Sequence, residues 1–239
     1  MARTIDHEAH AARREQILDV AQKLVVTRGY EQMTIQDVLT ELGISKGALY
    51  HYFGSKQDLL TGIVDRMADE VHAQLSSVAE DSRPGAADKL TQIFQALAGW
   101  KTRNRKQLVA LLRAWNSDSN ALTRHKTRAG ITDRLAPLFE RVIDQGVRDK
   151  TFTLPSTAGT GRVLLSLIHD LNDRLADLFF AYESGNADLA TVEQTVTAYT
   201  TAIERVLGVA AGSIRLVDLP VVYAWFDPHW QKKEKGSSS

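Results

Sequence analysis

The stretch from Thr34 to Leu60, TIQDVLTELGISKGALYHYFGSKQDLL, constrains the fold more than any other part of the chain. Apolar residues recur at helical spacing after Thr34, a residue type that favours helix N-caps. Gly43 ends this helix, because glycine readily adopts the positive φ found at helix C-termini. Ser45 then caps a second, very short helix, and Ser55 caps a third. The pattern predicts a helix-turn-helix unit, whose second helix can enter the major groove of DNA.

Helical periodicity continues on both sides of this segment. The spacing of Ile17, Val20, Leu24 and Val25 predicts a helix over about residues 8–28. Further helices are predicted over about residues 55–75, 86–100, 105–115, 122–145, 156–182 and 189–207. Pro137 is expected to kink or split the fourth of these. No strand-like alternation precedes residue 213, so the sequence predicts an all-α fold.

Composition excludes several classes of protein. The chain has 239 residues, which suggests one or two domains. It has no cysteine, so it offers no disulfide framework and no thiolate site. No apolar run reaches the length of about 18 residues that a membrane span needs, and the N-terminus lacks the apolar core of a signal peptide. We therefore expect a cytoplasmic protein with no membrane partner.

Charge gives no simple sign of a nucleic-acid partner. The net charge is zero, and residues 1–60 hold seven Lys or Arg against eight Asp or Glu. DNA-binding proteins usually show a basic surface. A local basic face remains open, because Lys46 and Lys56 stand at the starts of two helices, where the helix dipole also favours phosphate.

Four motifs in order carry a family resemblance: T-I-x-D-V at residues 34–38, L-G-I-S-K-G at 42–47, L-Y-x-Y-F at 49–53 and S-K-x-x-L-L at 55–60. Together they resemble the DNA-binding unit of TetR-family transcriptional regulators, over roughly residues 10–65. The resemblance implies a homodimer that binds double-stranded DNA, most often as a repressor, under the control of a small-molecule effector. It also implies that residues of the motifs lie at the DNA face, namely Thr34, Ser45, Lys46, Gly47, Tyr50, His51 and Lys56, with Tyr52 divided between that face and packing.

The last two predicted helices each carry an apolar seam with steps of four and three residues. Such seams suit left-handed helix packing, and they fit either a core within one chain or half of a dimer interface. The family resemblance, which implies dimers joined through the last two helices, favours the interface. The seam residues are Leu164, Ile168, Leu171 and Leu175 on one helix, and Val192, Val196, Tyr199 and Ile203 on the other.

Polar and aromatic residues on otherwise apolar helices are candidate effector contacts, although each is more often a core or capping residue. They are Trp100, Arg113, Trp115, Asn116, His169 and Asn172. Residues 101–128 carry eight Lys or Arg and one acid, which indicates either a solvated face or attraction for an anionic effector or nucleic acid. His169 and Asp173 could share a metal, but two ligands do not make a site, so no metal and no other cofactor are predicted.

The domains expected are a three-helix helix-turn-helix DNA-binding domain over residues 1–54, a helical effector-binding and dimerisation domain over 55–212, and a tail over 213–239. The tail is apolar up to Trp230, and we expect this part to dock on the body or on a partner subunit, an extended segment being one form it can take; its end, from Lys232, is expected to be disordered.

No Gly-rich phosphate loop, nucleophile elbow or Cys–His pair occurs, so no catalytic residue and no enzyme are predicted. The sequence predicts a ligand-responsive DNA-binding regulator that binds a pseudo-palindromic operator as a homodimer. The alternative is an all-α small-molecule-binding protein whose helix-turn-helix contacts another protein.

Overall fold

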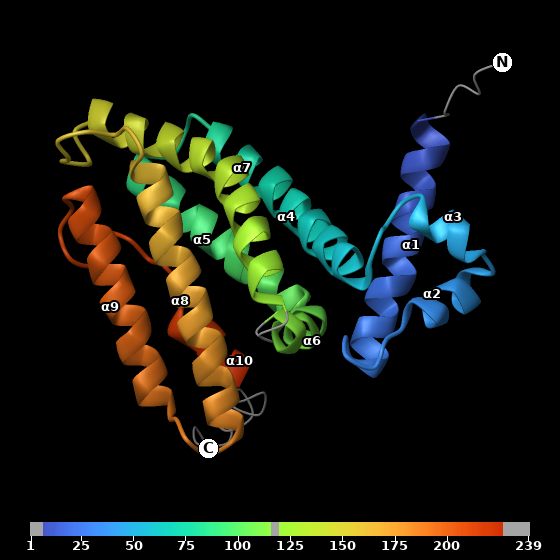
Figure 1. Ribbon diagram of the computed structural model, residues 1–239. Coiled ribbons are helices and arrows are strands. Elements are labelled where there is room, and N and C mark those ends of the chain that lie inside the picture. Colours follow the sequence, from blue (N-terminus) through green and yellow to red (C-terminus); the bar gives the residue numbers. More distant parts are fainter. Residues whose placement is uncertain (1–6, 116–119, 227–239) are drawn as a thin grey trace, which may run out of the picture. The chain divides into compact units, whose positions relative to one another are not determined.

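A computed structural model describes residues 7–115 and 120–226 of the chain, and this described part contains helices and their connections but no strand (Figure 1). The predicted all-α fold class, with an N-terminal helix-turn-helix, is confirmed. None of the described helices is both long and apolar enough to cross a membrane. The helices are α1 (His7–Arg28), α2 (Ile35–Leu42), α3 (Lys46–Tyr50), α4 (Lys56–Glu80), α5 (Ala86–Arg103), α6 (Arg105–Trp115), α7 (Ala121–Arg148), α8 (Thr160–Glu183), α9 (Leu189–Leu207) and α10 (Leu219–Phe226).

Contacts between residues divide the chain into two compact units. Unit 1 consists of Met1–Glu70 and Asn104–Ile131, and unit 2 of Val71–Arg103 and Thr132–Ser239. Two helices, α4 and α7, therefore contribute residues to both units. The functional boundary expected between residues 54 and 55 stays a prediction, and it falls inside unit 1.

The first half of α4 belongs to unit 1 because it is packed and ion-paired there. The side chains of Leu59 and Ile63 are completely buried. Arg66 donates to Glu15 at 3.2 Å and to Asp19 at 2.7 Å, and its side chain is only 19% exposed. Both carboxylates come from α1, so Arg66 fastens α4 to α1 by charge as well as by apolar contact.

The core of unit 2 is formed by apolar faces of its helices. Helices α8 and α9 pack along each other, and the rings of Phe94 and Phe139 lie 6.2 Å apart between α5 and α7. Helix α7 runs unbroken through Pro137. The proline thus does not split the helix, because its buried neighbours Leu135 and Leu138 hold both sides of it in the core.

The apolar segment after α9 packs on unit 2, and part of it forms the helix α10 rather than an extended segment. Ile214 and Leu216 are buried, and α10 packs against α5, α8 and α9. Pro220 is compatible with this helix because it stands in the first turn, where its missing N–H is not needed. The expectations for Trp230 and for the end from Lys232 lie outside the described residues.

Candidate nucleic-acid interface

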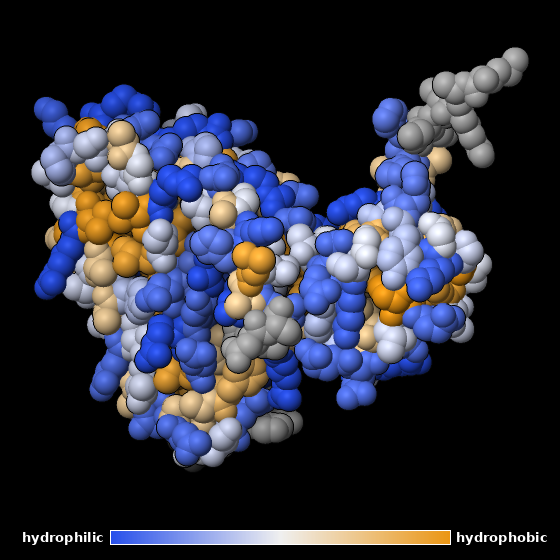
Figure 2. All heavy atoms as spheres, viewed as in Figure 1, coloured by the Kyte–Doolittle hydropathy of each residue, from blue (hydrophilic) through white to orange (hydrophobic). Residues whose placement is uncertain are grey.

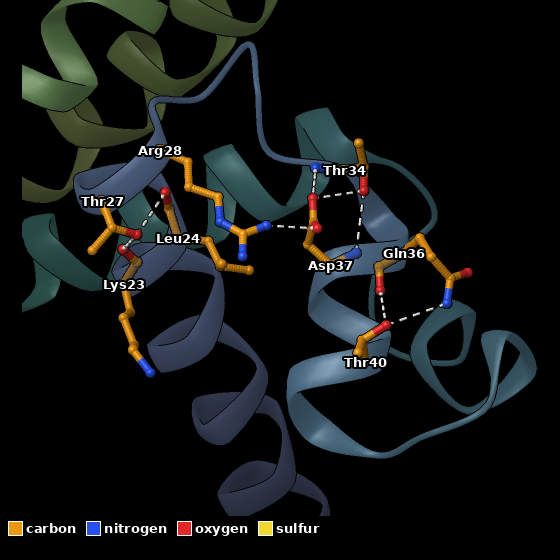
Figure 3. Close-up of polar contacts among 8 residues, drawn as sticks. All are labelled: Lys23, Leu24, Thr27, Arg28, Thr34, Gln36, Asp37 and Thr40. Carbon is orange, nitrogen blue, oxygen red and sulfur yellow. Dashed lines mark hydrogen bonds and ion pairs between the residues drawn. The ribbon is translucent and has the colours of Figure 1, made fainter.

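Local hydrogen bonds shape the helix-turn-helix. Thr34 is the N-cap of α2, and its hydroxyl accepts from the Asp37 backbone N–H at 3.1 Å (Figure 3). The Asp37 carboxylate accepts in return from the Thr34 N–H at 2.8 Å, which completes a capping box. Gly43 ends α2 with a φ of 60°, a left-handed conformation that glycine adopts without steric cost. Ser45 then caps α3 by accepting from the Ala48 N–H at 3.2 Å.

Charge reinforces the start of α2. Arg28, in the last turn of α1, donates to the Asp37 carboxylate at 2.7 Å, as Figure 3 shows. The hydrogen bonds from the hydroxyl and the backbone of Thr34, together with this guanidinium, hold the pKa of Asp37 below its usual value. A carboxylate in the first turn also suits the positive end of the helix.

Helix α3 turns one polar face to solvent and anchors itself by a single apolar residue. Leu49 is completely buried, whereas Ser45, Lys46 and Gly47 are exposed. Tyr50 is 43% exposed, and its ring lies 5.5 Å from the Lys46 ammonium. A Cβ added at Gly47 would meet no protein atom within 4 Å, so the packing of the protein does not require glycine there. These four predicted DNA-face residues share one open surface.

The remaining predicted DNA-face residues make contacts within the protein. The Tyr52 ring stacks on His10 of α1 at 4.5 Å, and the His51 ring meets both of them edge-on. The Lys56 ammonium donates to the Glu31 carbonyl oxygen at 3.1 Å and lies 4.4 Å from a tyrosine ring, that of Tyr30. Lys56 therefore ties the start of α4 to the loop before α2.

Ion pairing explains how residues 1–60, with seven Lys or Arg against eight Asp or Glu, can present a local positive charge. Lys23 pairs with Glu41 at 2.6 Å. Arg28 pairs with Asp37 at 2.7 Å. Arg66 pairs with both Glu15 and Asp19. Lys46 has no carboxylate within ion-pair distance among the described residues. Four of the eight acids of residues 1–60 are thus paired with other cations, and the ammonium on α3 stays available for a partner.

The candidate effector contacts do not all lie in one unit. Trp100, His169 and Asn172 belong to unit 2, whereas Arg113 and Trp115 lie on α6 in unit 1, and Asn116 lies outside the described residues. Arg113 lines a cleft of about 300 Å³ beside the loop that follows α1.

In unit 2, two of the candidate side chains have polar partners on other helices. The Asn172 side-chain oxygen accepts from Lys101 at 2.6 Å, and His169 Nε2 lies 3.1 Å from the Thr132 hydroxyl. Sequence reasoning did not single out Lys101 or Thr132; the only signal was the basic run that begins at residue 101. Within the described residues no group of three or more metal-ligating side chains occurs, so the pair His169 and Asp173 finds no third ligand there.

Most of the seam predicted as a dimer interface is buried within the single chain, and the interface itself stays a prediction. Two members, Leu175 and Tyr199, are partly exposed, and Tyr199 donates to the Asp170 carboxylate. The other six side chains are buried in unit 2, namely Leu164, Ile168, Leu171, Val192, Val196 and Ile203. The heptad-like spacing fitted either use, and at these six positions the packing of α8 and α9 within the chain already buries the side chains.

Comparison with known proteins agrees with this geometry. Residues 17–63 match the family model described as "Bacterial regulatory proteins, tetR family". The chain is 24% identical over 204 residues to a Bacillus subtilis protein named as an uncharacterized HTH-type transcriptional regulator, YfiR, and this match covers 83% of the chain and 95% of the relative.

Solved structures extend the comparison. The TetR-family transcriptional regulator PfmR from Thermus thermophilus is 30% identical, with 65% of this chain and 83% of that one covered and a TM-score of 0.47. A TetR-family regulator from Pectobacterium atrosepticum, 18% identical with 84% and 97% covered, shares the fold with a TM-score of 0.63. The matching family model and the Bacillus subtilis relative are both named for regulation of transcription, which confirms the prediction of a regulator and not an enzyme. The chain therefore belongs to the TetR family of transcriptional regulators.

Proposed function

We propose that this DNA-binding regulator is a homodimeric repressor that binds a pseudo-palindromic operator in the cytoplasm and releases it when unit 2 binds a small molecule. The observation that carries operator recognition is the open face of α3, where Lys46 and Tyr50 lie side by side and Gly47 leaves space for an incoming groove. The repressor role rests on the family resemblance, since repressors predominate among such regulators.

Selection of bound fragments from the genome identifies the operator. Lys46→Ala and Tyr50→Ala should then abolish the shift of that duplex at physiological salt while leaving thermal unfolding unchanged. The loss of one phosphate contact should also lower the salt slope of binding by about one. Lys23→Ala is the matched control, because it removes the same charge from the same unit at a site already paired with Glu41. Normal binding of DNA by both α3 variants would refute the assignment of α3 as the helix that recognises DNA.

Gly47→Ala separates recognition from folding. The added methyl group meets no protein atom within 4 Å and lies in a helix, where alanine is the better residue. Stability should therefore be retained or slightly increased. The methyl group would stand between the backbone of α3 and the base edges, so DNA affinity should fall. A variant that binds the operator as tightly as the wild type would show that this backbone does not approach DNA closely.

For the dimer we propose the outward faces of α8 and α9, since their inward faces are occupied. Val163 on α8 is 48% exposed, and the partly exposed residues Leu167 and Val206 belong to the same two helices. Figure 2 shows apolar surface gathered near the start of α8 and the end of α9. Two such faces related by two-fold symmetry would bury one another.

Sedimentation equilibrium tests this face. Val163→Glu should shift the protein towards monomer, because a carboxylate would be desolvated at the contact. Leu122→Glu is the control, as Leu122 is 65% exposed and lies on α7. Equal dimerisation of both variants would place the interface elsewhere. A wild-type protein that stays monomeric would refute the homodimer itself.

Effector control needs a path between the two units, and α4 supplies a continuous one, since it runs from Lys56 in unit 1 to Glu80 in unit 2. A ligand that favours one position of α4 changes DNA affinity only by its difference in affinity for the two states. If no genomic fragment binds while a metabolite does, the alternative of a small-molecule-binding protein replaces this proposal.

A further inference from the structure

The ammonium of Lys101 in unit 2 has an unusual set of partners. It donates to the side-chain oxygen of Asn172 at 2.6 Å, across from α5 to α8. An ammonium carries three N–H donors. Among the described residues it has this one hydrogen-bond acceptor, and no carboxylate lies within ion-pair distance of it. A neutral amide therefore stands where a counter-ion is expected.

A second lysine of the same unit shows what a purely structural role looks like. Lys89 is 3% exposed, and its ammonium reaches both the Ala79 carbonyl oxygen at 3.1 Å and the Gln145 side-chain oxygen at 2.7 Å. Lys89 thus links the C-terminal end of α4 to α7. Lys101 is partly exposed as a residue and its ammonium has a single acceptor, so two of its three N–H donors find no acceptor among the described residues.

The surroundings of Lys101 disfavour its own charge. Crowding by protein atoms desolvates the ammonium and lowers the pKa of Lys101 to about 8, although part of the side chain reaches solvent. Most molecules still carry the charge at neutral pH. Buried charges are normally paired, because an unpaired one loses hydration without compensation. An anion at this point would supply the missing partner.

Further polar groups lie on the face of α8 that carries Asn172. His169 stands three residues before Asn172 on α8, which puts both side chains on one face of the helix. His169 in turn meets the Thr132 hydroxyl of α7 at 3.1 Å. Helix α8 is thus linked to α5 by the pair Lys101–Asn172 and to α7 by the pair Thr132–His169. Ile168 and Leu171 of the same helix are buried apolar residues.

We propose that unit 2 binds a small molecule that combines one carboxylate with an apolar body, and that Lys101 is its counter-ion. This inference rests on the proposed function, in which unit 2 takes up the effector. Asn172 holds the ammonium in place while the site is empty. The apolar residues of the same helix faces suit the body of the ligand, and one cation suits one anionic group.

Three probes with the same chain and different head groups test the proposal: octanoate, octanol and octylamine. Octanoate should raise the melting temperature of the full-length protein, whereas octanol and octylamine should have much smaller effects. Lys101→Met should weaken octanoate binding by about tenfold or more, which corresponds to about 1.4 kcal/mol. Lys101→Arg keeps the charge and should bind within a few-fold of the wild type, and Lys106→Met controls for loss of an exposed lysine.

Proton uptake gives a readout that a structural role would not produce. A bound carboxylate stabilises the protonated amine, so octanoate binding near pH 8 should take up a fraction of a proton. Calorimetry in two buffers of different ionisation enthalpy measures this uptake, and it should vanish in Lys101→Met. Equal binding of the three probes, no binding of octanoate, or unchanged octanoate affinity in Lys101→Met would each overturn the inference.

DNA binding is measured separately, so that the two proposals can fail independently. If octanoate binds through Lys101 but operator affinity is unchanged, the anion site stands and effector control through it fails. If a neutral compound releases the operator while octanoate does not bind, effector control stands and the anion site fails.

Discussion

The N-cap of α2 offers a quantitative test of what stabilises the helix-turn-helix. Replacing Thr34 by Val keeps the shape of the side chain and removes its hydroxyl. That hydroxyl accepts from the Asp37 N–H at 3.1 Å and donates to the Asp37 carboxylate at 2.7 Å. The Thr34 N–H and Arg28 would still bind the carboxylate, so the box is weakened rather than abolished.

The expected cost is that of losing an N-cap, about 1 kcal/mol within a range of roughly 0.5–2. Helix α2 has only 8 residues, fewer than the 12–15 or so that an isolated helix needs, so it depends on such contacts and on the burial of Val38 and Leu39. A change of 1 kcal/mol multiplies the population of the open form by about five. Thr34→Ser keeps the hydroxyl and should cost a few tenths of a kcal/mol at most.

Hydrogen–deuterium exchange of the peptide that covers α2 measures this opening directly. In Thr34→Val, exchange should be about fivefold faster over α2 and unchanged over α9, which lies in unit 2. Thr34→Ser should match the wild type. Unchanged exchange in the Val variant, or equal acceleration in both variants, would refute the claim that the hydroxyl stabilises the helix.

Three further outcomes follow from single residues. Because the pKa of Asp37 is lowered on folding, the stability that its carboxylate contributes is present above the unfolded pKa of 3.8 and is lost as pH falls through the folded pKa. The resistance of the helix-turn-helix to urea should thus fall below about pH 4, and less so in Asp37→Asn. Lys101 differs from Asp37 in that its charged form destabilises the fold, because the folded protein loses this proton near pH 8 and the unfolded chain near 10.5; the unfolding free energy should therefore also rise with pH between these values, by on the order of 1–3 kcal/mol relative to Lys101→Met. Gly208→Ala should cost more than about 2 kcal/mol by thermal unfolding, since φ is 64° and the new Cβ would lie 2.0 Å from the Thr153 carbonyl oxygen; Gly185→Ala, with φ of 74° and open space, should cost only about 1 kcal/mol.

The charges of residues 1–60 show why a net charge of zero for the chain does not argue against DNA binding. Counting residues treats every charge as available. In the structure, Glu41 and Asp37 are held by Lys23 and Arg28 at hydrogen-bond distance. Pairing leaves Lys46 uncompensated on the exposed face of α3, and that surface, not the sum of charges, is what a phosphate meets.

The helix-turn-helix was predictable because its signals are local. The cap at Thr34 reaches three residues along the chain, Gly43 supplies the conformation that its own position needs, and Ser45 caps the helix that it begins. Interactions at a separation of three or four residues depend on little besides the residue types involved. The same reason made the positions of α1 to α9 predictable to within about five residues, whereas α10 was not predicted.

Contacts between distant parts of the chain were decided by the tertiary structure. The apolar steps of α8 predicted that Leu164 and Ile168 are buried, but they did not predict which surface buries them. In the structure, packing within the chain buries both. Lys56 proved to be held by a carbonyl oxygen 25 residues away, and Lys101 meets Asn172 across 71 residues. Apart from α10, the sequence by itself determined where helices begin, end and turn, since those choices are made within one or two turns of backbone. The three-dimensional packing determined which buried faces and which charges find partners, because an apolar stripe or an ammonium has no preferred partner until chain folding brings one within reach.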